Sequence, residues 1–485
     1  MCARFNQKTV NTTLTENRAG GEAYKQSPKL ELVSLLLTSF VSDTTYESGD
    51  ARIGRMVNLI DSIPDKKFVA KAGLFAREKW GMRSISHVLA TLLANRVKGA
   101  HWSRKFFDRV VVRPDDMTEI FSLYNGTYGK PYPNALKRGF ADAFGKFNAY
   151  QLAKYRGEGR QFSLMDIANL VHPTPTQKNM RAMKALINGT LKNTGTWESK
   201  LSTAGKSDNV KEAKAEAWRD LLKQGKLGYF AGVRNIRNIV QTKDPELVRM
   251  LCDLLIDPAR IKNSKVLPFR LYVAYKELVT DVDVPIEVFR SIDKALALTT
   301  MNMPDLAGSI AVLVDISGSM DHRIGQSKVN AREIAYLMAS MVGIGYPDVD
   351  MYVFSSHAEK VGPILSTSVI TQVMSGFTSN VPIAGTNFRD AIDTLNKPYE
   401  HIMIFSDMQA WEGYHSPRDR VSAYKKKYKC SPHIWSFDLM GYGDMQFPEH
   451  NVYCIPGYSD KVFDVMGILV QDKMNLIKEI DAIDL

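Results

Sequence analysis

A group of oxygen-bearing side chains lies in the stretch Ser309–Met320, S-I-A-V-L-V-D-I-S-G-S-M. Asp315, Ser317 and Ser319 alternate along the chain, and Gly318 allows the backbone to bend between the two serines, so a tight loop can direct all three side-chain oxygens to one point. One carboxylate and two hydroxyls suit Mg²⁺, which requires oxygen ligands in octahedral geometry and is usually held by one or two carboxylates. The spacing predicts a metal-binding loop, and a simple polar turn is the alternative.

Two further oxygen donors follow at positions that a doubly wound sheet would bring to the same edge. Thr386 lies in the glycine-containing segment I-A-G-T-N-F, and Asp407 follows the apolar run Ile402–Phe405 after one serine. Ile310–Val314 is a similar apolar run, typical of a parallel strand that is covered on both faces. Because ligands of open α/β sheets gather at the carboxyl ends of the strands, the sequence predicts one site for Mg²⁺ or Mn²⁺. Its ligands are Asp315, Ser317, Ser319, Thr386 and Asp407.

This set of five residues resembles the metal-ion-dependent adhesion site of von Willebrand factor A domains, with all five positions matched. The rest of the C-terminal part fits a parallel sheet, because predicted helices and strands alternate along it. A helix is expected at Val329–Val342, and strands are expected at Val349–Phe354, Ile434–Phe437 and Val452–Ile455.

Length and composition describe a packed protein. The 485 residues, 45% of them apolar, are sufficient for two or three domains. The four cysteines form no C-x-x-C pair and the nine histidines are scattered, so neither a disulfide framework nor a zinc site is indicated. The first ten residues lack the apolar core of a signal peptide, and no run approaches the ~18 apolar residues that span a bilayer. We expect a cytoplasmic protein that does not bind membranes.

Charge separates the two halves of the chain. From Leu306 onward there are 15 Lys and Arg against 21 Asp and Glu, which leaves 48 basic against 31 acidic residues before it, a surplus of 17 positive charges. A surplus of that size is expected of a module that binds phosphates. A well-solvated helical surface is the alternative, since charge alone does not distinguish the two.

The N-terminal part consists of successive amphipathic helices of roughly 8 to 16 residues, broken by Gly, Pro or Asp. Helix pairs that follow one another favour an α-solenoid, although a compact bundle has the same periodicity. Pro304 and Gly308 separate the last helical pattern from the first strand. We therefore predict an α plus α/β protein with a helical domain at 1–304 and a sheet domain at 305–485, and we interpret Lys192–Lys206 as a long connection between helices.

Almost the whole chain resembles the Ro (TROVE-module) family of RNA-binding proteins. The resemblance implies a ring-like α-solenoid of HEAT-like repeats followed by the von Willebrand factor A domain. It also implies an outer basic surface for small structured noncoding RNAs and a ring cavity for single-stranded ends of misfolded RNAs. The matching stretches are N-R-A-G-G-E-A-Y, F-V-A-K-A-G-L-F-A-R-E-K-W-G-M-R, P-N-A-L-K-R-G-F-A-D-A-F, K-Y-R-G-E-G-R-Q-F-S-L-M-D-I-A-N-L-V-H-P, V-R-N-I-R-N and V-L-P-F-R-L-Y-V-A-Y-K.

The family's RNA-binding positions can be carried over residue by residue. Lys154 and Arg156 match basic positions, and His172 matches the histidine that closes the same segment; a purely structural histidine before Pro173 is the alternative for His172. Arg160 follows the insertion-like G-E-G, so its match is open. Lys137 and Arg138 extend the same basic face or are solvated helix residues. Lysine and arginine can neutralise phosphates, and histidine can donate to a phosphate or stack on a base.

Three functions from different classes compete. The leading one is a noncatalytic RNA-binding protein of the Ro type, a monomer within a ribonucleoprotein for RNA quality control or processing. The second is a metal-dependent protein-binding module whose Mg²⁺ shell is completed by a partner's carboxylate; an exoribonuclease is one candidate partner. The third, a phosphoesterase, is disfavoured because the predicted site has a single metal and no evident general base.

Overall fold

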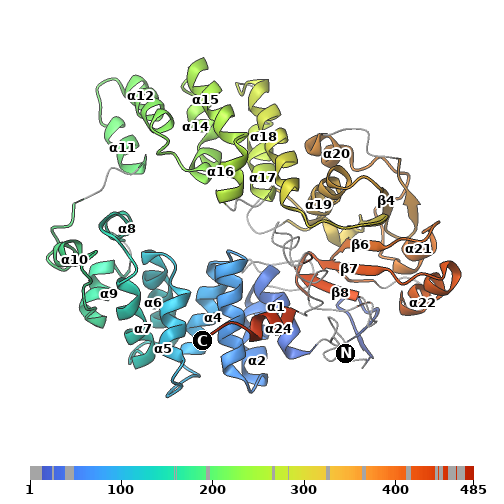
Figure 1. Ribbon diagram of the computed structural model, residues 1–485, viewed down its shortest axis with the longest axis horizontal. Helices are drawn as coiled ribbons and strands as arrows, with labels where there is room; N and C mark the ends of the chain where they lie inside the picture. The colour runs from blue at the N-terminus through green and yellow to red at the C-terminus, as the bar shows by residue number, and fades with distance from the viewer. Residues whose placement is uncertain are drawn as a thin grey trace. The chain divides into compact units, whose positions relative to one another are not determined.

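Most described residues of the computed structural model are helical (Figure 1). The chain divides into two compact units, each built from two separate segments. We call residues 52–208 with 477–485 the helical unit, and residues 1–51 with 209–476 the mixed unit. The structure describes residues 14–24, 27–38, 49–157, 159, 161–192, 197–264, 268–281, 283–323, 328–362, 368–410, 417–442, 446, 452–456, 466 and 476–485.

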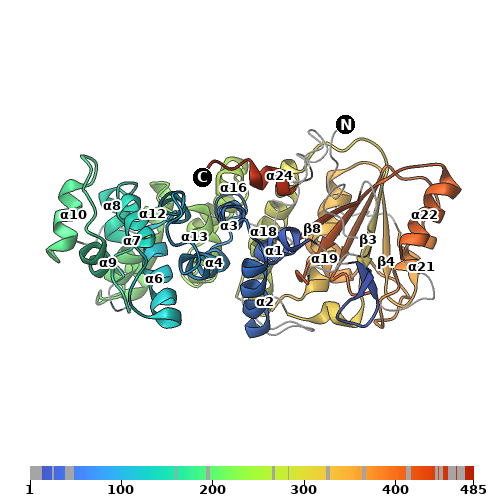
Figure 2. The same cartoon turned by 90° about the horizontal axis from the view of Figure 1, so that it is seen from below.

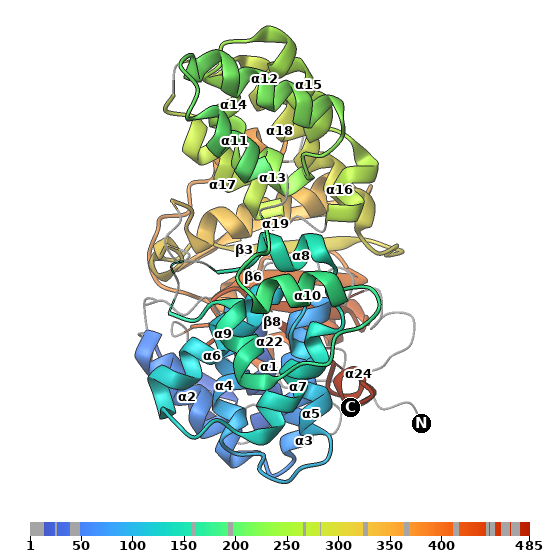
Figure 3. The same cartoon turned by 90° about the vertical axis from the view of Figure 1, so that its left-hand side faces the viewer.

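The helical unit is a succession of short helices in which α3 packs on α4, α4 on α6, α5 on α7, and α7 on α9 (Figure 3). Gly139 lets α5 and α7 approach closely, because a Cβ at this position would lie 2.5 Å from Cβ of Phe107 and 2.7 Å from the carbonyl oxygen of Arg104. The elements are α2 (Gly49–Ser62), α3 (Lys66–Leu74), the π-helical turn η1 (Phe75–Lys79), α4 (Ser84–Ala94), α5 (Ser103–Val110), α6 (Pro114–Tyr128), α7 (Asn134–Phe144), α8 (Ala149–Lys154), α9 (Leu164–Val171), α10 (Met180–Ile187), α11 (Trp197–Ala204) and α24 (Leu476–Asp481).

Local sequence signals explain where several of these helices begin. Asn148 caps α8 and Ser163 caps α9, each accepting a hydrogen bond from the backbone N–H three residues later. In both cases the side chain of that third residue accepts a hydrogen bond from the backbone N–H of the capping residue, which completes a capping box. A cap of this kind typically stabilises a helix by about 1 kcal/mol.

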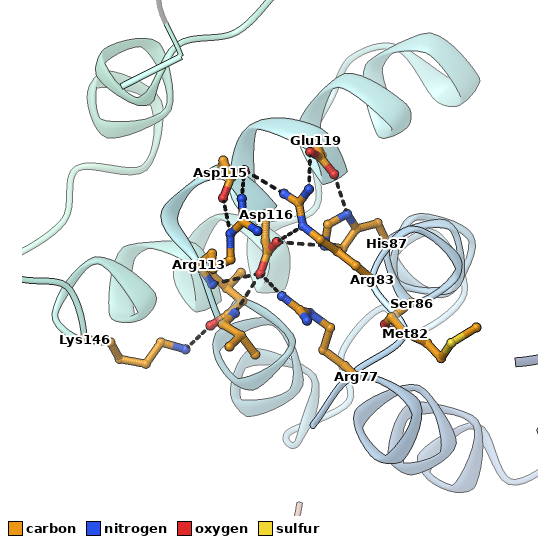
Figure 4. A network of polar contacts seen from close by, with 12 residues as sticks. Arg77, Met82, Arg83, Ser86, His87, Arg113, Asp115, Asp116, Glu119 and Lys146 are labelled. Atoms are coloured by element: carbon orange, nitrogen blue, oxygen red, sulfur yellow. Dashed lines mark hydrogen bonds and ion pairs between the residues drawn. The ribbon is translucent and has the colours of Figure 1, made fainter. Parts of the chain in front are cut away.

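Buried charges hold the N-terminal helices of this unit together (Figure 4). Asp116, which has no exposed surface, accepts hydrogen bonds from Arg77 at 2.7 Å and from Nε of Arg83 at 2.8 Å. His87 lies 3.2 Å from the same carboxylate. Burial alone would raise the pKa of Asp116, but the hydrogen bond from His87 and the charge of Arg77 hold this pKa well below its usual range. The carboxylate is therefore ionised and fully paired inside the unit.

The mixed unit contains an N-terminal hairpin, a set of helices and one sheet. Its helical part comprises α1 (Pro28–Thr38), α12 (Val210–Lys223), α13 (Tyr229–Arg234), α14 (Ile236–Val240), α15 (Pro245–Leu255), α16 (Pro258–Ser264), α17 (Pro268–Leu278), α18 (Ile286–Leu298) and η2 (Thr299–Asn302). The remaining elements are β1 (Leu14–Glu16), β2 (Glu22–Tyr24), β3 (Ile310–Asp315), η3 (Gly318–Asp321), α19 (Ala331–Gly345), β4 (Val349–Phe354), β5 (Ala358–Lys360), α20 (Val369–Ser375), α21 (Phe388–Asp393), β6 (His401–Ser406), α22 (Pro417–Tyr428), β7 (His433–Asp438) and β8 (Val452–Pro456).

The six-stranded sheet has the order β5-β4-β3-β6-β7-β8, with only β5 antiparallel to its neighbour. Helices α21 and α22 lie on one face, and α19 packs against β3, β4 and β6 (Figure 2). Alternate strand residues such as Leu313, Phe354 and Ile404 join Phe388 of α21 and Tyr424 of α22 in one apolar core. Every residue of β3 and β6 is buried, as expected for central parallel strands.

The predicted fold class is confirmed: a mostly helical N-terminal part precedes a doubly wound sheet. The structure also contains elements that were not predicted from the sequence. Helix α11 (Trp197–Ala204) lies within the stretch that the sequence suggested as a connection. The hairpin of β1 and β2 was not predicted, because its strands have only three residues each and carry no strong alternation. Within the described residues, none of the helices combines the length and apolarity needed to cross a membrane.

Candidate metal site and cationic pockets

The two predicted carboxylate ligands lie side by side because their strands are neighbours in the sheet. Strands β3 and β6 pair in parallel with Val314 opposite Phe405, so Asp315 at the end of β3 lies beside Ser406, and Asp407 follows directly. Both carboxylates are completely buried. The strand order reverses at this pair, since β4 lies on the other side of β3, and such switch points are where open α/β sheets bind ligands.

Hydrogen bonds connect four of the five predicted ligands. Asp315 Oδ1 accepts from the backbone N–H of Ser317 at 2.8 Å, and the hydroxyls of Ser317 and Ser319 are 3.3 Å apart. Ser319 in turn hydrogen-bonds Asp407. The oxygens of Asp315, Ser317, Ser319 and Asp407 therefore form one continuous cluster at the sheet edge.

The loop that carries Thr386, the fifth predicted ligand, contacts the loop of the two serines. The backbone N–H of Gly318 donates to the carbonyl oxygen of Ala384 at 2.9 Å, which places the loop before α21 against the serine loop. Thr386, two residues further on, is 98% buried. The structure therefore brings the loop of Thr386 to the loop that carries Ser317 and Ser319.

The electrostatics of the two aspartates fit a cation. Burial raises the pKa of Asp315, and burial together with the charge of Asp315 raises the pKa of Asp407 to about 8. Asp407 Oδ2 is buried and has no hydrogen-bond partner in the described part of the chain. A divalent cation would satisfy that oxygen and compensate both charges, so the donor set fits Mg²⁺ or Mn²⁺. The described residues contain no group of three His, Cys, Asp or Glu that could hold a metal, so this site depends on its hydroxyls.

Two polar residues near the cluster were missed by the sequence analysis. Ser406 donates from Oγ to Asp315 Oδ2 at 2.6 Å, and Asp438, which ends β7 opposite Ser406, raises the pKa of Asp407 through its charge. Asp438 also accepts from the backbone N–H groups of Met440 and Gly441. Both residues could have been predicted from the sequence, because each is the polar last residue of an apolar strand.

In the helical unit, three predicted RNA-binding residues line one pocket of about 710 Å³. Lys137 and Arg138 come from α7, and His172 comes from the end of α9. Arg104 of α5 is a further cation in this pocket, held by Asp142 through two hydrogen bonds of 2.6 and 2.8 Å. We call this the cationic pocket. Arg104 was not predicted, because it lies in a helix without a recognisable motif.

His172 has an exposed side chain and an unusual backbone conformation. It has φ of 48° and ψ of 62°, in the left-handed region, and its N–H donates to Ala168 to close α9. Pro173 disfavours a right-handed helical conformation at the preceding residue, which explains why the helix ends here. Glycine or asparagine usually occupies a left-handed helix end, so a histidine at this point is uncommon.

The remaining basic residues that the sequence predicted do not line the cationic pocket. Lys154 ends α8, with its ammonium 5.6 Å from the ring of Tyr155, and the guanidinium of Arg113 lies 4.7 Å from the same ring. Arg156 donates to the carbonyl oxygen of Leu191, so part of its guanidinium supports the fold. Arg160 lies outside the described residues.

A second pocket, of about 480 Å³, lies in the mixed unit between α13, α14 and α17. Its lining includes Arg234, Arg237 and Arg270, together with Phe230, which is 41% exposed. Arg237 is 3.2 Å from Asp281, whereas the guanidinium of Arg234 lies 5.9 Å from the Phe230 ring. We call this the arginine pocket. It combines positive charge with an exposed aromatic face.

Comparison with known proteins agrees with this architecture. The TROVE domain family matches residues 21–194 and 188–291, and the Ro60 vWA domain family matches residues 309–435. The crystal structure of the Deinococcus radiodurans Ro (RSR) protein is similar, with a TM-score of 0.64 at 15% identity, covering 92% of this chain and 100% of that one.

Sequence comparison also finds telomerase protein component 1 of Rattus norvegicus and of Mus musculus. Each is 26% identical over 140 residues, which is 27% of this chain and 5% of the relative. The chain thus spans only a small fraction of the length of these curated relatives.

Proposed function

This chain belongs to the Ro family of TROVE-domain proteins with a C-terminal von Willebrand factor A domain, and from this premise we propose that it is a noncatalytic RNA-binding protein. It would bind small structured noncoding RNA through the cationic pocket and its surroundings, as part of a ribonucleoprotein in cytoplasmic RNA quality control. The observation that carries this proposal is that Lys137 and Arg138 of α7 and His172 at the end of α9 line one open pocket.

The chemistry of the cationic pocket suits an RNA backbone. Lys137 and Arg138 can neutralise adjacent phosphates, and the exposed ring of His172 can donate to a phosphate or stack on an unpaired base. The left-handed backbone at His172 supports the same interpretation, because conformations of this kind are retained where the surroundings hold a functional group in place. Lys154 would extend the surface, with Tyr155 held beside it by Arg113.

A filter-binding experiment tests this proposal. The variants Lys137→Ala/Arg138→Ala and His172→Ala are compared with the charge-matched control Lys98→Ala/Lys130→Ala, whose two lysines are exposed and lie outside the pocket. A structured small RNA should bind the pocket variants at least about tenfold more weakly and the control normally. Equal binding by all three folded proteins would reject the cationic pocket as the RNA site.

We assign single-stranded RNA to the arginine pocket. An exposed aromatic ring with guanidinium groups around it suits an unpaired strand, whose bases stack on aromatic faces while its phosphates contact the cations. Phe230→Ala/Arg234→Ala should weaken binding of an unpaired oligonucleotide more than binding of the structured RNA. Arg249→Ala, an exposed arginine of α15, is the matched control. An identical loss for both RNAs would contradict this division between the pockets.

The second candidate function is a metal-dependent protein contact, and the exposure of the cluster on one side favours it. Asp315, Ser317 and Asp407 would hold Mg²⁺ or Mn²⁺, whose positive charge attracts a carboxylate. Gly318 is exposed and Ser319 is half-buried, so a partner's acidic side chain can approach there. A partner such as an exoribonuclease should copurify in Mg²⁺ and be released by a chelator. Copurification that survives chelation would reject a contact through the metal.

A further inference from the structure

The loop that carries Asp407 is covered by a segment from the opposite end of the sequence. The turn Asn17–Gly21, which joins β1 to β2, lies against residues 409 and 410 and against Tyr442. We call it the N-terminal turn. Strands β1 and β2 pair antiparallel, with Leu14 opposite Tyr24, and the turn between them points its polar groups at the loop after β6.

Gln409 connects the N-terminal turn to the metal site. Its side-chain oxygen accepts from the backbone N–H of Arg18 at 2.7 Å, and its own backbone N–H donates to Asp407 Oδ1 at 3.1 Å. Its Nε2 also donates to the carbonyl oxygen of Asp407 at 3.3 Å. Gln409 is fully buried. Two of these bonds hold the carboxylate and the backbone carbonyl of Asp407, and the third joins Gln409 to the N-terminal turn.

Asn17 gives the N-terminal turn its shape and its attachment. Its side-chain oxygen accepts from the N–H groups of Ala19 and Gly21 at 3.0 and 2.9 Å, which closes the turn. Its Nδ2 donates to the carbonyl oxygen of Ala410 at 2.5 Å. Only 5% of Asn17 is exposed, so losing this residue would leave buried backbone groups unpaired.

The same loop is supported from two other sides. Met408 has φ of 60°, in the left-handed region, and its carbonyl oxygen accepts from Nε2 of the buried Gln446 at 2.9 Å. Its N–H donates to Ser406 Oγ, which itself donates to Asp315. A loop in a disfavoured conformation persists only when its surroundings stabilise it. The N-terminal turn contributes the contact that leads to Asp407, through Gln409.

We propose that Gln409 is a positioning residue for the metal ligand Asp407, and that docking of the N-terminal turn and binding of a divalent cation stabilise each other. This inference rests on the proposed metal site. Groups that orient metal ligands through hydrogen bonds typically contribute 10- to 100-fold to metal affinity. Thermodynamic linkage is reciprocal. If docking of the turn raises the affinity for the cation by some factor, bound cation raises the equilibrium constant for docking by the same factor.

Manganese binding by the full chain, measured by calorimetry, tests the first half. Gln409→Met keeps the volume but removes both side-chain hydrogen bonds, and it should weaken Mn²⁺ binding about tenfold. Asn17→Ala should weaken it about fivefold, although Asn17 touches neither aspartate. Asn148→Ala removes an asparagine cap in the helical unit and should leave Mn²⁺ affinity unchanged. Unchanged affinity in folded Gln409→Met and Asn17→Ala proteins would overturn the inference.

Hydrogen exchange on the unaltered protein tests the second half without any substitution. Saturating Mn²⁺ should slow exchange of the backbone amides at 14–24 about fivefold and leave those of α10 unaffected. Exchange that does not respond to bound Mn²⁺ overturns the linkage while the metal site stands. If the unaltered protein binds no Mn²⁺ in calorimetry, the proposed metal site fails, and this inference fails with it.

Discussion

The carboxylate and hydroxyl cluster and the cationic pocket differ in charge and in exposure. The cluster has acidic, buried side chains, and the pocket has basic side chains near the surface. Asp315, Ser317 and Asp407 are buried at the edge of a sheet, whereas Arg138 and His172 are exposed on short helices. Mg²⁺ requires nearly ideal octahedral geometry and gives up its water reluctantly, so the protein oxygens that bind it must already be in place. Phosphates can remain hydrated and still be attracted over about 8 Å at physiological salt. The comparison teaches that rigidity is needed in one region and accessibility in the other.

The largest expected effect comes from the buried cluster. Asp407→Asn removes one of two buried carboxylates, so we expect Mn²⁺ affinity to fall more than about 100-fold while RNA affinity stays within about twofold. In chelator, the same variant should melt at a higher temperature than the unaltered protein, because burial and the charge of Asp315 disfavour an ionised side chain at this position. Thermal unfolding with and without Mn²⁺ measures both effects. A parallel loss of RNA binding would show that the two regions are not independent.

The next effect compares a buried charge of the helical unit with an exposed one. Asp116→Ala leaves Arg77 and Arg83 without their buried partner, and we expect a loss of roughly 3–5 kcal/mol in the free energy of unfolding. Asp142→Ala breaks the exposed pair with Arg104 and should cost less than about 1 kcal/mol. Denaturant unfolding of both variants gives the two values. Equal losses would contradict the distinction between buried and exposed charge.

The third prediction concerns the pH dependence of stability, at the edge of the sheet opposite the carboxylate and hydroxyl cluster. Burial, aided by the charge of His433, lowers the pKa of His401 to about 4 from an ordinary value of 6.5. The neutral ring accepts from Nε1 of Trp435 and lies 3.2 Å from the carbonyl oxygen of Ala307. Between pH 6.5 and pH 4, His401 therefore binds a proton in the unfolded chain but stays neutral in the folded chain. The stabilisation present above pH 6.5 is lost as the pH falls toward 4.

The size of this loss is about 3 kcal/mol, since each pKa unit corresponds to about 1.4 kcal/mol. Denaturant unfolding of the unaltered protein at several pH values between 4 and 7 measures it. His401→Gln removes the titrating group, so its stability should depend less steeply on pH in this window. Identical pH dependence in the two proteins would show that His401 is not responsible.

The smallest effect is expected at the exposed cationic pocket. Lys137→Ala/Arg138→Ala should weaken binding of structured RNA about tenfold and reduce the slope of log K against log salt by about two, roughly 0.9 for each lost phosphate contact. Unfolding curves should not change, because both side chains lie at the surface of α7. A weaker affinity with an unchanged salt slope would indicate that the pair acts through something other than phosphates.

The amino-acid sequence by itself determined the class of fold, and it predicted that Asp315, Ser317, Ser319 and Asp407 share one edge of the sheet. Alternating Asp315, Ser317 and Ser319 after an apolar strand, with Asp407 after a second one, required only the rule that parallel strands end at the same edge. The strands of the sheet were predictable for the same reason, because a run of buried β-branched residues has few alternatives. The family resemblance supplied Lys137, Arg138 and His172, and could not show that they surround one pocket.

Only the tertiary structure decided which distant segments meet. Arg104 joins the cationic pocket because Gly139 lets α5 and α7 approach closely, and no local pattern around Arg104 indicates this. The N-terminal turn reaches Gln409 across almost the whole length of the chain. The division at residue 304 stays a prediction, since helices after residue 209 pack in the same unit as the sheet. Local sequence specifies periodicity and caps, but such long-range contacts depend on the packing of the complete fold.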